Sequence, residues 1–354
     1  MIIDKYNVIG VMSGTSLDGI DIVYATYNFD ERWKFEIHKA VTFPYSERWK
    51  KILSDLPNES MTFLQEIDKD FTALLAEKIK VFIDVNGIED IDFVASHGHT
   101  ALHQPENKLT YQIGNIPDLA DILKRKVVCD FRIQDVELGG QGAPLVPIGD
   151  QLLFSDYDYC LNLGGFANIS TDINNERIAY DICPVNIVLN YYMSQIGKDF
   201  DDKGQLAATG EIYEPLLDKL NALHFYHSDY PKSLGYEWVK EHIFPLIASY
   251  KLDLNDILRT FIAHCAYQIS KEINKKDHAK VLITGGGTYN DFLISEIKTM
   301  TKSTLVLPEK MLIEYKEALI FGLLGVLKIR NEVNCLASVT GASKDHSSGK
   351  IFEP

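Results

Sequence analysis

The feature that most constrains this chain is a plan that occurs twice: an apolar strand, a glycine-rich turn and a second strand. The first copy runs through residues 7–12, a Ser-Gly-Thr-Ser-Leu-Asp turn and residues 19–29. The second copy covers residues 159–170 and turns at Gly164 and Gly165. A Rossmann dinucleotide site needs a strand, a turn and then a helix, so these hairpins fit that fold poorly.

A third glycine run, residues 285–287, follows an apolar strand at 281–284 and precedes a helical pattern at 290–299. Consecutive glycines allow several N–H groups to point into one concavity and hold phosphate oxygens. The first turn adds hydroxyl donors from Ser13, Thr15 and Ser16. Each stretch alone can be a plain turn, which Gly, Ser and Asp favour. Three such turns, two of them with carboxylates close by in the sequence, favour a triphosphate ligand.

The rest of the regular structure follows from hydrophobic periodicity. Apolar residues at helical spacing indicate a helix within 60–86, and short apolar runs indicate buried strands at 91–96 and 127–129. Further helices are predicted at 255–275 and 314–330. With 354 residues, the chain is long enough for two domains.

Composition and charge narrow the class of partners. The formal net charge is −15 without a clustered basic patch, which argues against nucleic acid or an anionic membrane as a partner. The longest apolar run, residues 318–327, has half the length of a membrane-spanning helix. No export signal is visible, and the five cysteines lack the close pairs of a disulfide framework or a zinc site. We therefore expect a cytoplasmic protein that binds a small molecule.

A longer series of motifs spans nearly the whole chain, and its order and spacing are specific. The segments are 12–21, 96–100 with His103 and Pro105, 112–114, 130–132 with Asp135, 139–145, 162–165 with Ala167 and Asn168, Asp181 with Pro184 and Asn186, 231–233 with Gly235 and Glu237, 285–287 with Asn290, 317–318 with Phe321, and 339–342. On these residues the chain resembles the anhydro-N-acetylmuramic acid kinase family, sugar kinases of the actin/hexokinase/Hsp70-like superfamily.

The resemblance implies an α/β fold of the two-domain actin-like ATPase (ribonuclease H-like) class, with ATP in a cleft between the lobes. The N-terminal lobe is expected to cover residues 1–128 plus 334–354 and to carry the first phosphate hairpin. The C-terminal lobe, residues 129–333, is expected to carry the second hairpin, the catalytic aspartate and an adenosine loop. The family also implies Mg²⁺ as a cofactor and a homodimer.

The reaction implied by the resemblance converts 1,6-anhydro-N-acetylmuramic acid, water and ATP to N-acetylmuramic acid 6-phosphate and ADP. Such a reaction needs a base for the attacking water and a cation for the phosphates. Asp181 matches the family's catalytic carboxylate and is predicted to be that base. Its alternative role is to cap the helix that starts near Pro184.

The predicted nucleotide contacts come from the three glycine turns. They are Gly14, Thr15, Ser16, Leu17, Asp18, Gly19, Ile20 and Asp21 in the first hairpin, Gly164, Gly165 and Asn168 in the second, and Gly285, Gly286 and Gly287 near adenosine. Asp18 and Asp21 flank the first turn, where carboxylates suit Mg²⁺ directly or through water. Stabilisation of the hairpin is the alternative role for both.

The predicted sugar contacts are His97, Thr100, Arg132, Asn186 and Glu317. Arg132 is suited to fork onto the lactyl carboxylate of the muramic sugar. Its alternative is a surface ion pair with Asp135. The two histidines at 97 and 103 lack a third ligand at metal-site spacing, so sugar contacts or core hydrogen bonds are the remaining roles.

Two more positions each have a second candidate role. Glu317 can instead be a first-turn acid favoured by the helix dipole. Lys232 and Ser233 match a Pro-Lys-Ser turn that the family presents to its ligands, and a plain loop is the alternative.

This chain departs from the family at several positions. The family's Asp-Thr-Gly-Pro-Gly-Asn reads Asp-Ile-Cys-Pro-Val-Asn at residues 181–186, and β-branched Val185 cannot adopt a positive φ without strain. Tyr236 replaces an arginine, and His99 replaces a glutamine. Two further functions therefore stay open: a kinase of another hexose or amino sugar with the same fold, and a sugar or nucleotide sensor that has lost turnover.

Overall fold

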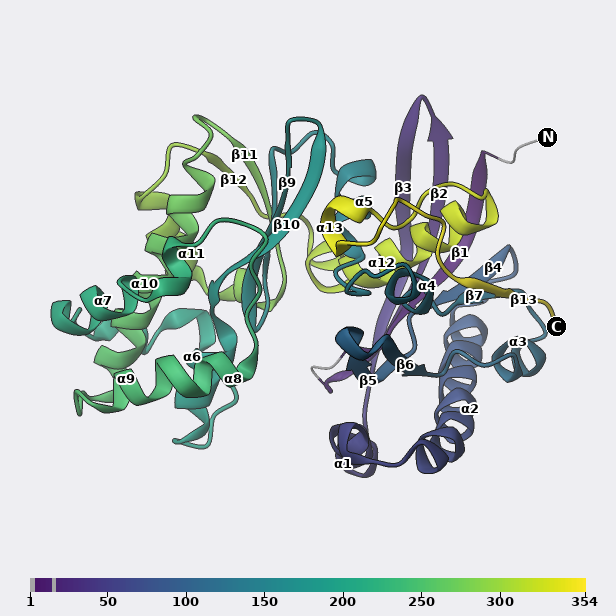
Figure 1. The fold of residues 1–354 in the computed structure, drawn as a ribbon, viewed down its shortest axis with the longest axis horizontal. Helices are drawn as coiled ribbons and strands as arrows, with labels where there is room; N and C mark the ends of the chain where they lie inside the picture. Colours follow the sequence, from purple (N-terminus) through teal and green to yellow (C-terminus); the bar gives the residue numbers. More distant parts are fainter. Residues whose placement is uncertain (1–3, 15–16) are drawn as a thin grey trace. The chain divides into compact units, whose positions relative to one another are not determined.

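The computed structural model describes residues 4–14 and 17–354. The chain divides into two compact units, which are drawn in Figure 1. The first unit comprises Met1–Leu153 and Tyr315–Pro354, and the second comprises Phe154–Glu314. Each unit has its own sheet and its own hydrophobic core.

The main sheet of the first unit has the strand order β13-β7-β4-β1-β2-β3. The strands are β1 (Lys5–Met12), β2 (Gly19–Asp30), β3 (Arg32–Pro44), β4 (Phe93–Ser96), β7 (Val127–Cys129) and β13 (Lys350–Phe352). β1, β2 and β3 form an antiparallel meander, whereas β4 runs parallel to β1 and β7 runs parallel to β4. A separate pair is made of β5 (His99–Gln104) and β6 (Leu109–Ile113).

The sheet of the second unit has the order β10-β9-β8-β11-β12. Its strands are β8 (Tyr159–Leu163), β9 (Phe166–Ile173), β10 (Glu176–Pro184), β11 (Lys280–Thr284) and β12 (Thr304–Val306). β8, β9 and β10 are antiparallel, and β11 runs parallel to both β8 and β12. This is the same order and the same set of directions as β3-β2-β1-β4-β7. The repeated plan agrees with the expected two-domain actin-like α/β class.

Helices surround both sheets. In the first unit they are α1 (Glu47–Asp55), α2 (Met61–Asn86), α3 (Asp118–Leu123), α4 (Ile133–Glu137), α5 (Val146–Leu153), α13 (Ala337–Thr340) and most of α12 (Lys310–Ile329). In the second they are α6 (Asn186–Ser194), α7 (Glu214–Asn221), α8 (Tyr236–Trp238), α9 (Phe244–Ala248), α10 (Leu254–Ile273) and α11 (Asp291–Thr299). Short 3₁₀ turns occupy Leu56–Asn58, Pro105–Asn107, Asp202–Gly204, Ala207–Thr209, His224–His227 and Gly286–Tyr289, and a π turn occupies Val239–Ile243.

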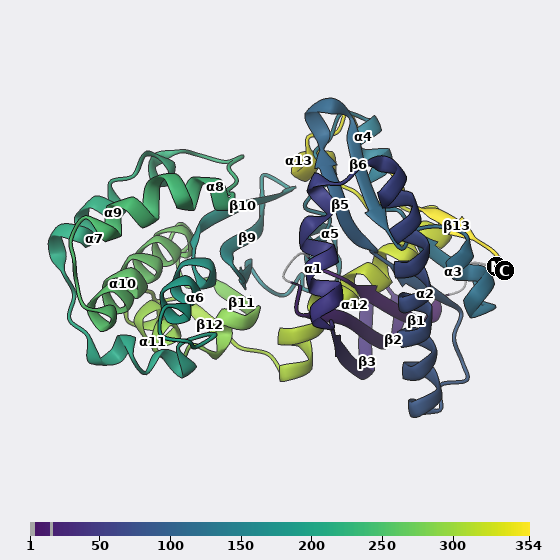
Figure 2. The same ribbon diagram turned by 90° about the horizontal axis from the view of Figure 1, so that it is seen from below.

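Helix α2 confirms the periodicity seen at residues 60–86. Ser60 caps its start, since the serine side chain accepts a hydrogen bond from the backbone N–H of Phe63 at 3.3 Å. Gly87 ends it in the left-handed conformation, with φ 59°. The apolar stripe packs on one face of the first sheet, and Figure 2 shows the helix in front of the strands.

Helix α12 covers the other face of the same sheet. Ile9 and Val11 belong to the core under α2, so Gly10 between them points the opposite way. A Cβ on Gly10 would collide with the carbonyl oxygen of Ala318 in α12. Tyr27 of β2 donates its hydroxyl proton to the carbonyl oxygen of Leu319 at 2.5 Å. The apolar run at 318–327 is therefore a buried helix.

This packing changes the division of the chain. The boundaries expected from the sequence were 128/129 and 333/334, whereas the compact units separate at 153/154 and 314/315. Residues 129–153 and 315–333 group with the first unit because α12 is bound to β1 and β2 and α5 is bound to α12. Arg132 and Glu317 consequently belong to the first unit.

Most predicted elements are present with small shifts at their ends. Both hairpins, the strands near 91–96, 127–129 and 281–284, and the helices near 255–275 and 290–299 are confirmed. Helix α12 begins at Lys310 and not at Glu314. No helix of the described residues is long and apolar enough to cross a membrane.

Candidate active site

The first hairpin uses several of its polar groups internally. Ser13 is buried, and its hydroxyl lies 2.5 Å from the Tyr45 hydroxyl and 3.3 Å from Nδ1 of His99. The expectation that Ser13 offers its hydroxyl to a ligand is therefore wrong. Thr15 and Ser16 lie outside the described residues. Ile20 has its side chain in the core, so only its backbone is left to meet a ligand.

Both predicted magnesium ligands also support the hairpin. Asp18 is exposed and accepts a hydrogen bond from the Gly19 N–H at 3.0 Å. Asp21 accepts one from the Thr42 hydroxyl at 2.6 Å, which links β2 to β3. Leu17 has φ 59°, a left-handed conformation that costs energy for a leucine and gives the turn its sharp bend. Carboxylate oxygens at an exposed turn are the donor type that Mg²⁺ prefers.

Arg132 is held in a defined orientation at the start of α4. Its Nε–H donates to Nε2 of His97 at 2.8 Å, and Nη1 donates to the carbonyl oxygen of Gly142 at 2.5 Å. Nδ1 of His97 lies 2.8 Å from the carbonyl oxygen of Gly98, so this nitrogen carries the proton and His97 is neutral. Burial, followed by the charge of Arg132, holds the pKa of His97 well below its usual value.

The remaining donors of Arg132 are available to an anion. Nη2 makes no hydrogen bond within the described part of the chain. Burial lowers the pKa of Arg132 to about 10, with Glu317 acting in the opposite direction, so the guanidinium stays charged near neutral pH. Asp135 is fully buried, and its Oδ2 accepts the Gly142 N–H at 2.6 Å. The alternative of a surface pair between Arg132 and Asp135 is therefore wrong.

Glu317 lies in the interior of α12, well past its first turn, so the role of a first-turn acid is wrong. Its side chain is exposed to solvent, yet desolvation by the surrounding protein raises the pKa of its carboxyl, while Lys316 and Arg132 act in the opposite direction. Asp18 also raises this pKa through its charge. Glu317, Arg132 and Asp18 thus share one electrostatic neighbourhood in the first unit.

A buried ion pair supports this neighbourhood. Nζ of Lys316 in α12 lies 2.7 Å from Oδ1 of Asp150 in α5, and both side chains are almost completely buried. The pair fixes the turn of α12 that carries Glu317. It was not predicted from the sequence, although a lysine just before a long apolar run is a usable signal.

Two further predicted sugar residues are less directly linked to Arg132. Thr100 is half-buried in β5, opposite Gln112 of β6. Asn186 belongs to the second unit, where its side-chain amide donates to the carbonyl oxygen of Leu163 at 3.4 Å. His103 is engaged by the hydroxyl of Thr110 at 3.2 Å.

The second hairpin holds the start of α6. The carbonyl oxygen of Gly165 accepts the N–H groups of Val185 at 2.8 Å and Ile187 at 3.2 Å. The carbonyl oxygen of Gly164 accepts the N–H of Asn186 at 3.3 Å. These bonds satisfy donors that a helix otherwise leaves unpaired at its start.

Asp181 lies on β10, opposite Asn168 of β9 and next to an irregularity of the strand pairing. Its Oδ2 accepts the N–H of Leu234 at 2.7 Å and the hydroxyl of Ser233 at 3.2 Å. Helix α6 begins at Asn186 after Val185, so Asp181 does not cap it. Burial raises the pKa of Asp181, and the bonds from Leu234 and Ser233 counteract part of that effect.

The loop that contains Lys232 and Ser233 is held by specific bonds to Asp181 and Glu272. The alternative of a plain loop is therefore wrong. The carbonyl oxygen of Lys232 accepts the Asp181 N–H at 3.1 Å. The Lys232 ammonium lies 3.9 Å from Oε1 of Glu272 and 4.9 Å from the Phe225 ring centroid. Tyr180 donates its hydroxyl proton to Oε2 of Glu272 at 2.7 Å. Glu272 is a supporting residue that the sequence motifs did not indicate.

The third glycine run is explained in part by packing inside the protein. Gly285 has φ 86°, and a Cβ there would lie 2.5 Å from Oδ1 of Asn162. A Cβ on Gly287 would lie 2.8 Å from Cβ of Leu163. At Gly286 the nearest atom would be Nδ2 of Asn186, at 3.9 Å. Of the three glycines, only Gly286 is at a position where a Cβ would make no close contact.

The departures from the family pattern fit the fold without strain in φ. Val185 has φ −130° and ψ −95°, so it does not adopt the positive φ that favours glycine. Cys183 and Val185 are fully buried in the core of the second unit. Tyr236 is exposed, with the Lys240 ammonium 4.9 Å from its ring centroid.

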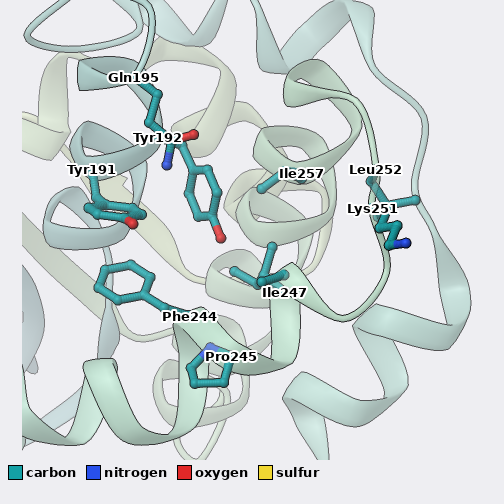
Figure 3. A pocket seen from close by; sticks show the side chains of 10 residues that line it. Tyr191, Tyr192, Gln195, Phe244, Pro245, Ile247, Lys251, Leu252 and Ile257 are labelled. Atoms are coloured by element: carbon teal, nitrogen blue, oxygen red, sulfur yellow. The ribbon is translucent and has the colours of Figure 1, made fainter.

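A separate cavity of about 460 Å³ lies between α6 and α9 in the second unit (Figure 3). Tyr191 and Phe244 stack at its edge with ring centroids 4.1 Å apart. None of the predicted site residues lines this cavity.

Comparisons with known proteins agree with the sequence motifs. The family model described as anhydro-N-acetylmuramic acid kinase matches residues 6–354. A curated relative of that name from Sulfurovum sp. is 30% identical over 365 residues and covers 99% of each chain. Another, from Mannheimia succiniciproducens, is 33% identical over 378 residues and covers 98% of this chain and 99% of its own.

Among solved structures, the activator of 2-hydroxyisocaproyl-CoA dehydratase from Clostridium difficile aligns with a TM-score of 0.45 and 11% identity, covering 92% of this chain and 96% of its own. The match of a single family model from residue 6 to the end of the sequence, with relatives of at least 30% identity over their whole length, places the chain. It belongs to the anhydro-N-acetylmuramic acid kinase family.

Proposed function

We propose that this protein converts 1,6-anhydro-N-acetylmuramic acid, water and ATP to N-acetylmuramic acid 6-phosphate and ADP. Membership of the family along nearly the whole chain supports this activity. The observation that carries the proposal is the geometry of Asp181, a carboxylate with a raised pKa that two donors hold by one oxygen. A base of this kind suits the removal of a proton from water.

In the proposed reaction, Oδ1 of Asp181 takes a proton from the attacking water. This oxygen makes no hydrogen bond to a described residue, whereas Oδ2 is bound by Ser233 and Leu234. The water oxygen forms a bond to C1 of the sugar as the C1–O6 bond breaks. The O6 oxygen then takes the γ-phosphoryl group of ATP, and ADP leaves. The proton on Asp181 passes to solvent, so atoms and charge balance.

Arg132 is proposed to bind the lactyl carboxylate of the sugar. His97 and Gly142 occupy Nε and Nη1, which fixes the plane of the guanidinium and leaves Nη2 for the substrate. A charged, pre-oriented guanidinium binds a carboxylate more strongly than a flexible ammonium does. Glu317 is proposed to accept hydrogen bonds from sugar hydroxyls, as are Thr100 and Asn186. The predicted sugar contact of His97 is wrong, because Gly98 and Arg132 occupy both of its ring nitrogens and the side chain is buried, so His97 positions Arg132 instead.

The glycine turns are proposed to bind the nucleotide. Its phosphates bind the backbone of Gly14 to Asp21 in the first hairpin, and Gly164, Gly165 and Asn168 in the second. Gly285, Gly286 and Gly287 are proposed to approach adenosine, and at Gly286 a Cβ would make only an ordinary contact, with Nδ2 of Asn186 at 3.9 Å. Mg²⁺ would be held by Asp18 and Asp21 and would neutralise phosphate charge.

The test is product analysis in ¹⁸O-labelled water. Purified protein is incubated with ATP, Mg²⁺ and the anhydro sugar, and the product is analysed by mass spectrometry. The proposal expects a 6-phosphate that carries one labelled oxygen at C1. A kinase of another hexose would yield no such product from the anhydro sugar and would phosphorylate an ordinary sugar without taking up solvent oxygen. A sensor without turnover would bind ATP and give no product.

Two further proposals concern the state of the protein in cells. The family resemblance supports a homodimer, which light scattering during gel filtration tests directly. The absence of paired cysteines among the described residues supports the reducing cytoplasm, which fractionation of expressing cells tests.

A further inference from the structure

A second cluster of chemically active side chains lies in the first unit and has no part in the proposed reaction. Asp135 of α4, Cys335 and His346 are all buried, with exposed fractions of 0%, 1% and 6%. Their potential ligand atoms lie within 4.8 Å of one another. Within residues 4–14 and 17–354 no other trio of histidine, cysteine, aspartate or glutamate is arranged in this way.

The distances suit one small cation. Sγ of Cys335 lies 3.0 Å from Oδ1 of Asp135, and Nε2 of His346 lies 3.6 Å from the same oxygen. Two ligands of a tetrahedral zinc ion are roughly 3.3–3.5 Å apart, given bonds of about 2.0 Å to oxygen or nitrogen and 2.3 Å to sulfur. The distances from Oδ1 of Asp135 to Sγ and to Nε2 therefore each lie within a few tenths of an ångström of the values that zinc requires, and Sγ and Nε2 lie within 4.8 Å of each other. The Thr340 hydroxyl also donates to Oδ1 at 2.7 Å and can keep one lone pair while the cation takes the other.

His346 provides an independent sign of a missing partner. Its Nδ1 lies 3.1 Å from the carbonyl oxygen of Lys344 and donates to it. The neutral ring then carries its lone pair on Nε2, which is buried and has no hydrogen-bond partner in the described chain. That lone pair faces the oxygen of Asp135, also an acceptor. Two buried acceptors facing each other repel unless a proton or a cation lies between them.

We propose that Asp135, Cys335 and His346 bind a zinc ion, through Oδ1, Sγ and Nε2. Cysteine, histidine and carboxylate ligands together are typical of zinc. The thiolate and carboxylate would neutralise the charge of the ion, as a buried site requires. On binding, the thiol proton that now points to Asp135 passes to solvent. A water molecule would complete the tetrahedron.

The surroundings favour a structural role for this ion. The backbone N–H and carbonyl groups of Cys335 and His346 bond to each other at 3.1 Å in both directions, which sets the two ligands side by side. Asp135 keeps the Gly142 N–H on its other oxygen, and the Gly142 carbonyl binds Arg132. The ion would therefore tie the C-terminal segment to the loop that orients Arg132.

The spacing of the ligands explains why the sequence shows no zinc motif. Asp135 and Cys335 are 200 residues apart, and the antiparallel bridge between Cys335 and His346 completes the set only in the folded chain. A search for closely spaced cysteines cannot detect ligands that come together only on folding, and for this reason the sequence predicted no zinc site.

The experiment measures metal binding by the full-length protein without nucleotide or sugar. The protein is stripped with a chelator, loaded with Zn²⁺, dialysed and assayed for metal, and a second sample is loaded with Co²⁺. The proposal expects about one zinc per chain, a thiolate-to-cobalt charge-transfer band, and a thermal unfolding midpoint that rises with Zn²⁺. Cys335→Ser and His346→Ala should each weaken zinc binding at least ~10-fold.

Cys160→Ser is the matched control, because Cys160 is a similarly buried thiol that lies beside the Arg177 guanidinium and far from the trio in the sequence. It should bind cobalt with the same band as the wild type. A folded wild-type protein that retains no zinc and shows no thiolate band would overturn the proposal, and the pair of His346 and Asp135 would then be a buried ion pair. A band that persists in Cys335→Ser would overturn it as well.

Discussion

The backbone N–H of Leu234 donates to Oδ2 of Asp181 at 2.7 Å, and the neighbouring Ser233 hydroxyl reaches the same oxygen. Residues more than fifty positions apart are thus joined at a single carboxylate oxygen. The bond from the Asp181 N–H to the Lys232 carbonyl adds a third link to the loop. This arrangement leaves Oδ1 as the atom that can exchange a proton, and it makes the role of Asp181 testable.

Asp181→Asn should lower kcat by about 10²- to 10⁴-fold, because an amide cannot take a proton from water. ATP affinity, measured by calorimetric titration, should change little, because the asparagine side chain has the same size as aspartate and can occupy the same position. Asp199→Asn, at an exposed position of the same unit, serves as the control and should keep full activity. Near-normal turnover by Asp181→Asn would show that another group is the base.

Ser233→Ala should move the acid limb of the pH profile of kcat/KM to higher pH. The Ser233 hydroxyl lowers the pKa of Asp181 by stabilising the carboxylate, so its loss raises that pKa. The shift should be up to ~1 pH unit, which corresponds to the ~0.5–1.5 kcal/mol of an ordinary hydrogen bond. Ser249→Ala is the control, because the Ser249 hydroxyl donates to the carbonyl oxygen of Leu246 in the preceding turn of its own helix. An unchanged pH profile in Ser233→Ala would show that Ser233 does not influence the pKa of the base.

Arg132→Lys should raise KM for the muramic sugar at least ~10-fold and leave KM for ATP unchanged. The ammonium cannot donate to His97, Gly142 and a carboxylate in one plane. An anhydro-N-acetylglucosamine, which lacks the lactyl group, separates lost recognition from general damage. Its KM should be the same for the wild type and for Arg132→Lys. Arg48→Lys, at an exposed position of α1, is the control. Equal losses for both sugars would mean that Arg132 does not read the carboxylate.

Lys316→Met should destabilise the first unit by about 3–5 kcal/mol, because it leaves the buried Asp150 carboxylate without its cation. The double variant with Asp150→Leu should recover most of this loss, since neither charge then remains buried. Lys310→Met, which removes an exposed pair with Glu314 on the same helix, should cost less than ~1 kcal/mol. Urea unfolding measures all three. A double variant as unstable as Lys316→Met would contradict the ion pair's role.

The parts of the fold that could be predicted from sequence are those encoded locally. Both hairpins could be recognised because apolar runs flank a glycine turn, and α2 because its buried face repeats at helical spacing. Strand β3 was not predicted, although its residues alternate between charged and apolar, which is the pattern of a half-buried strand at the edge of a sheet. Helix α12 begins before its continuous apolar run. Its first residues present a charged face to solvent, while Ile313 among them packs in the interior.

Only those residues of the candidate site that belong to a recognisable motif could be predicted from the sequence. Asp181, Arg132 and Glu317 came from the family pattern, whereas their partners depend on tertiary contacts that no local pattern encodes. Glu272, which accepts a hydrogen bond from the Tyr180 hydroxyl, is 92 positions away from Tyr180 in the sequence. The glycines at 285 and 287 were assigned to a ligand, and their close approach to Asn162 and Leu163 gives a second reason for glycine at both positions. Close approach between segments of one chain gives the same sequence signal as close approach to a nucleotide.

His99, a position where this chain differs from its family, should influence stability in acid. Burial lowers the pKa of His99 to about 4, against 6.5 for an ordinary histidine. Between these pH values the unfolded chain binds the proton more readily, so His99 reduces stability as the pH falls from 6.5 towards 4. His99→Gln should flatten this fall by up to ~1.4 kcal/mol per pH unit. Urea unfolding from pH 4.5 to 7 measures it, with the exposed His224→Gln as control, and an unchanged slope in His99→Gln would contradict the prediction.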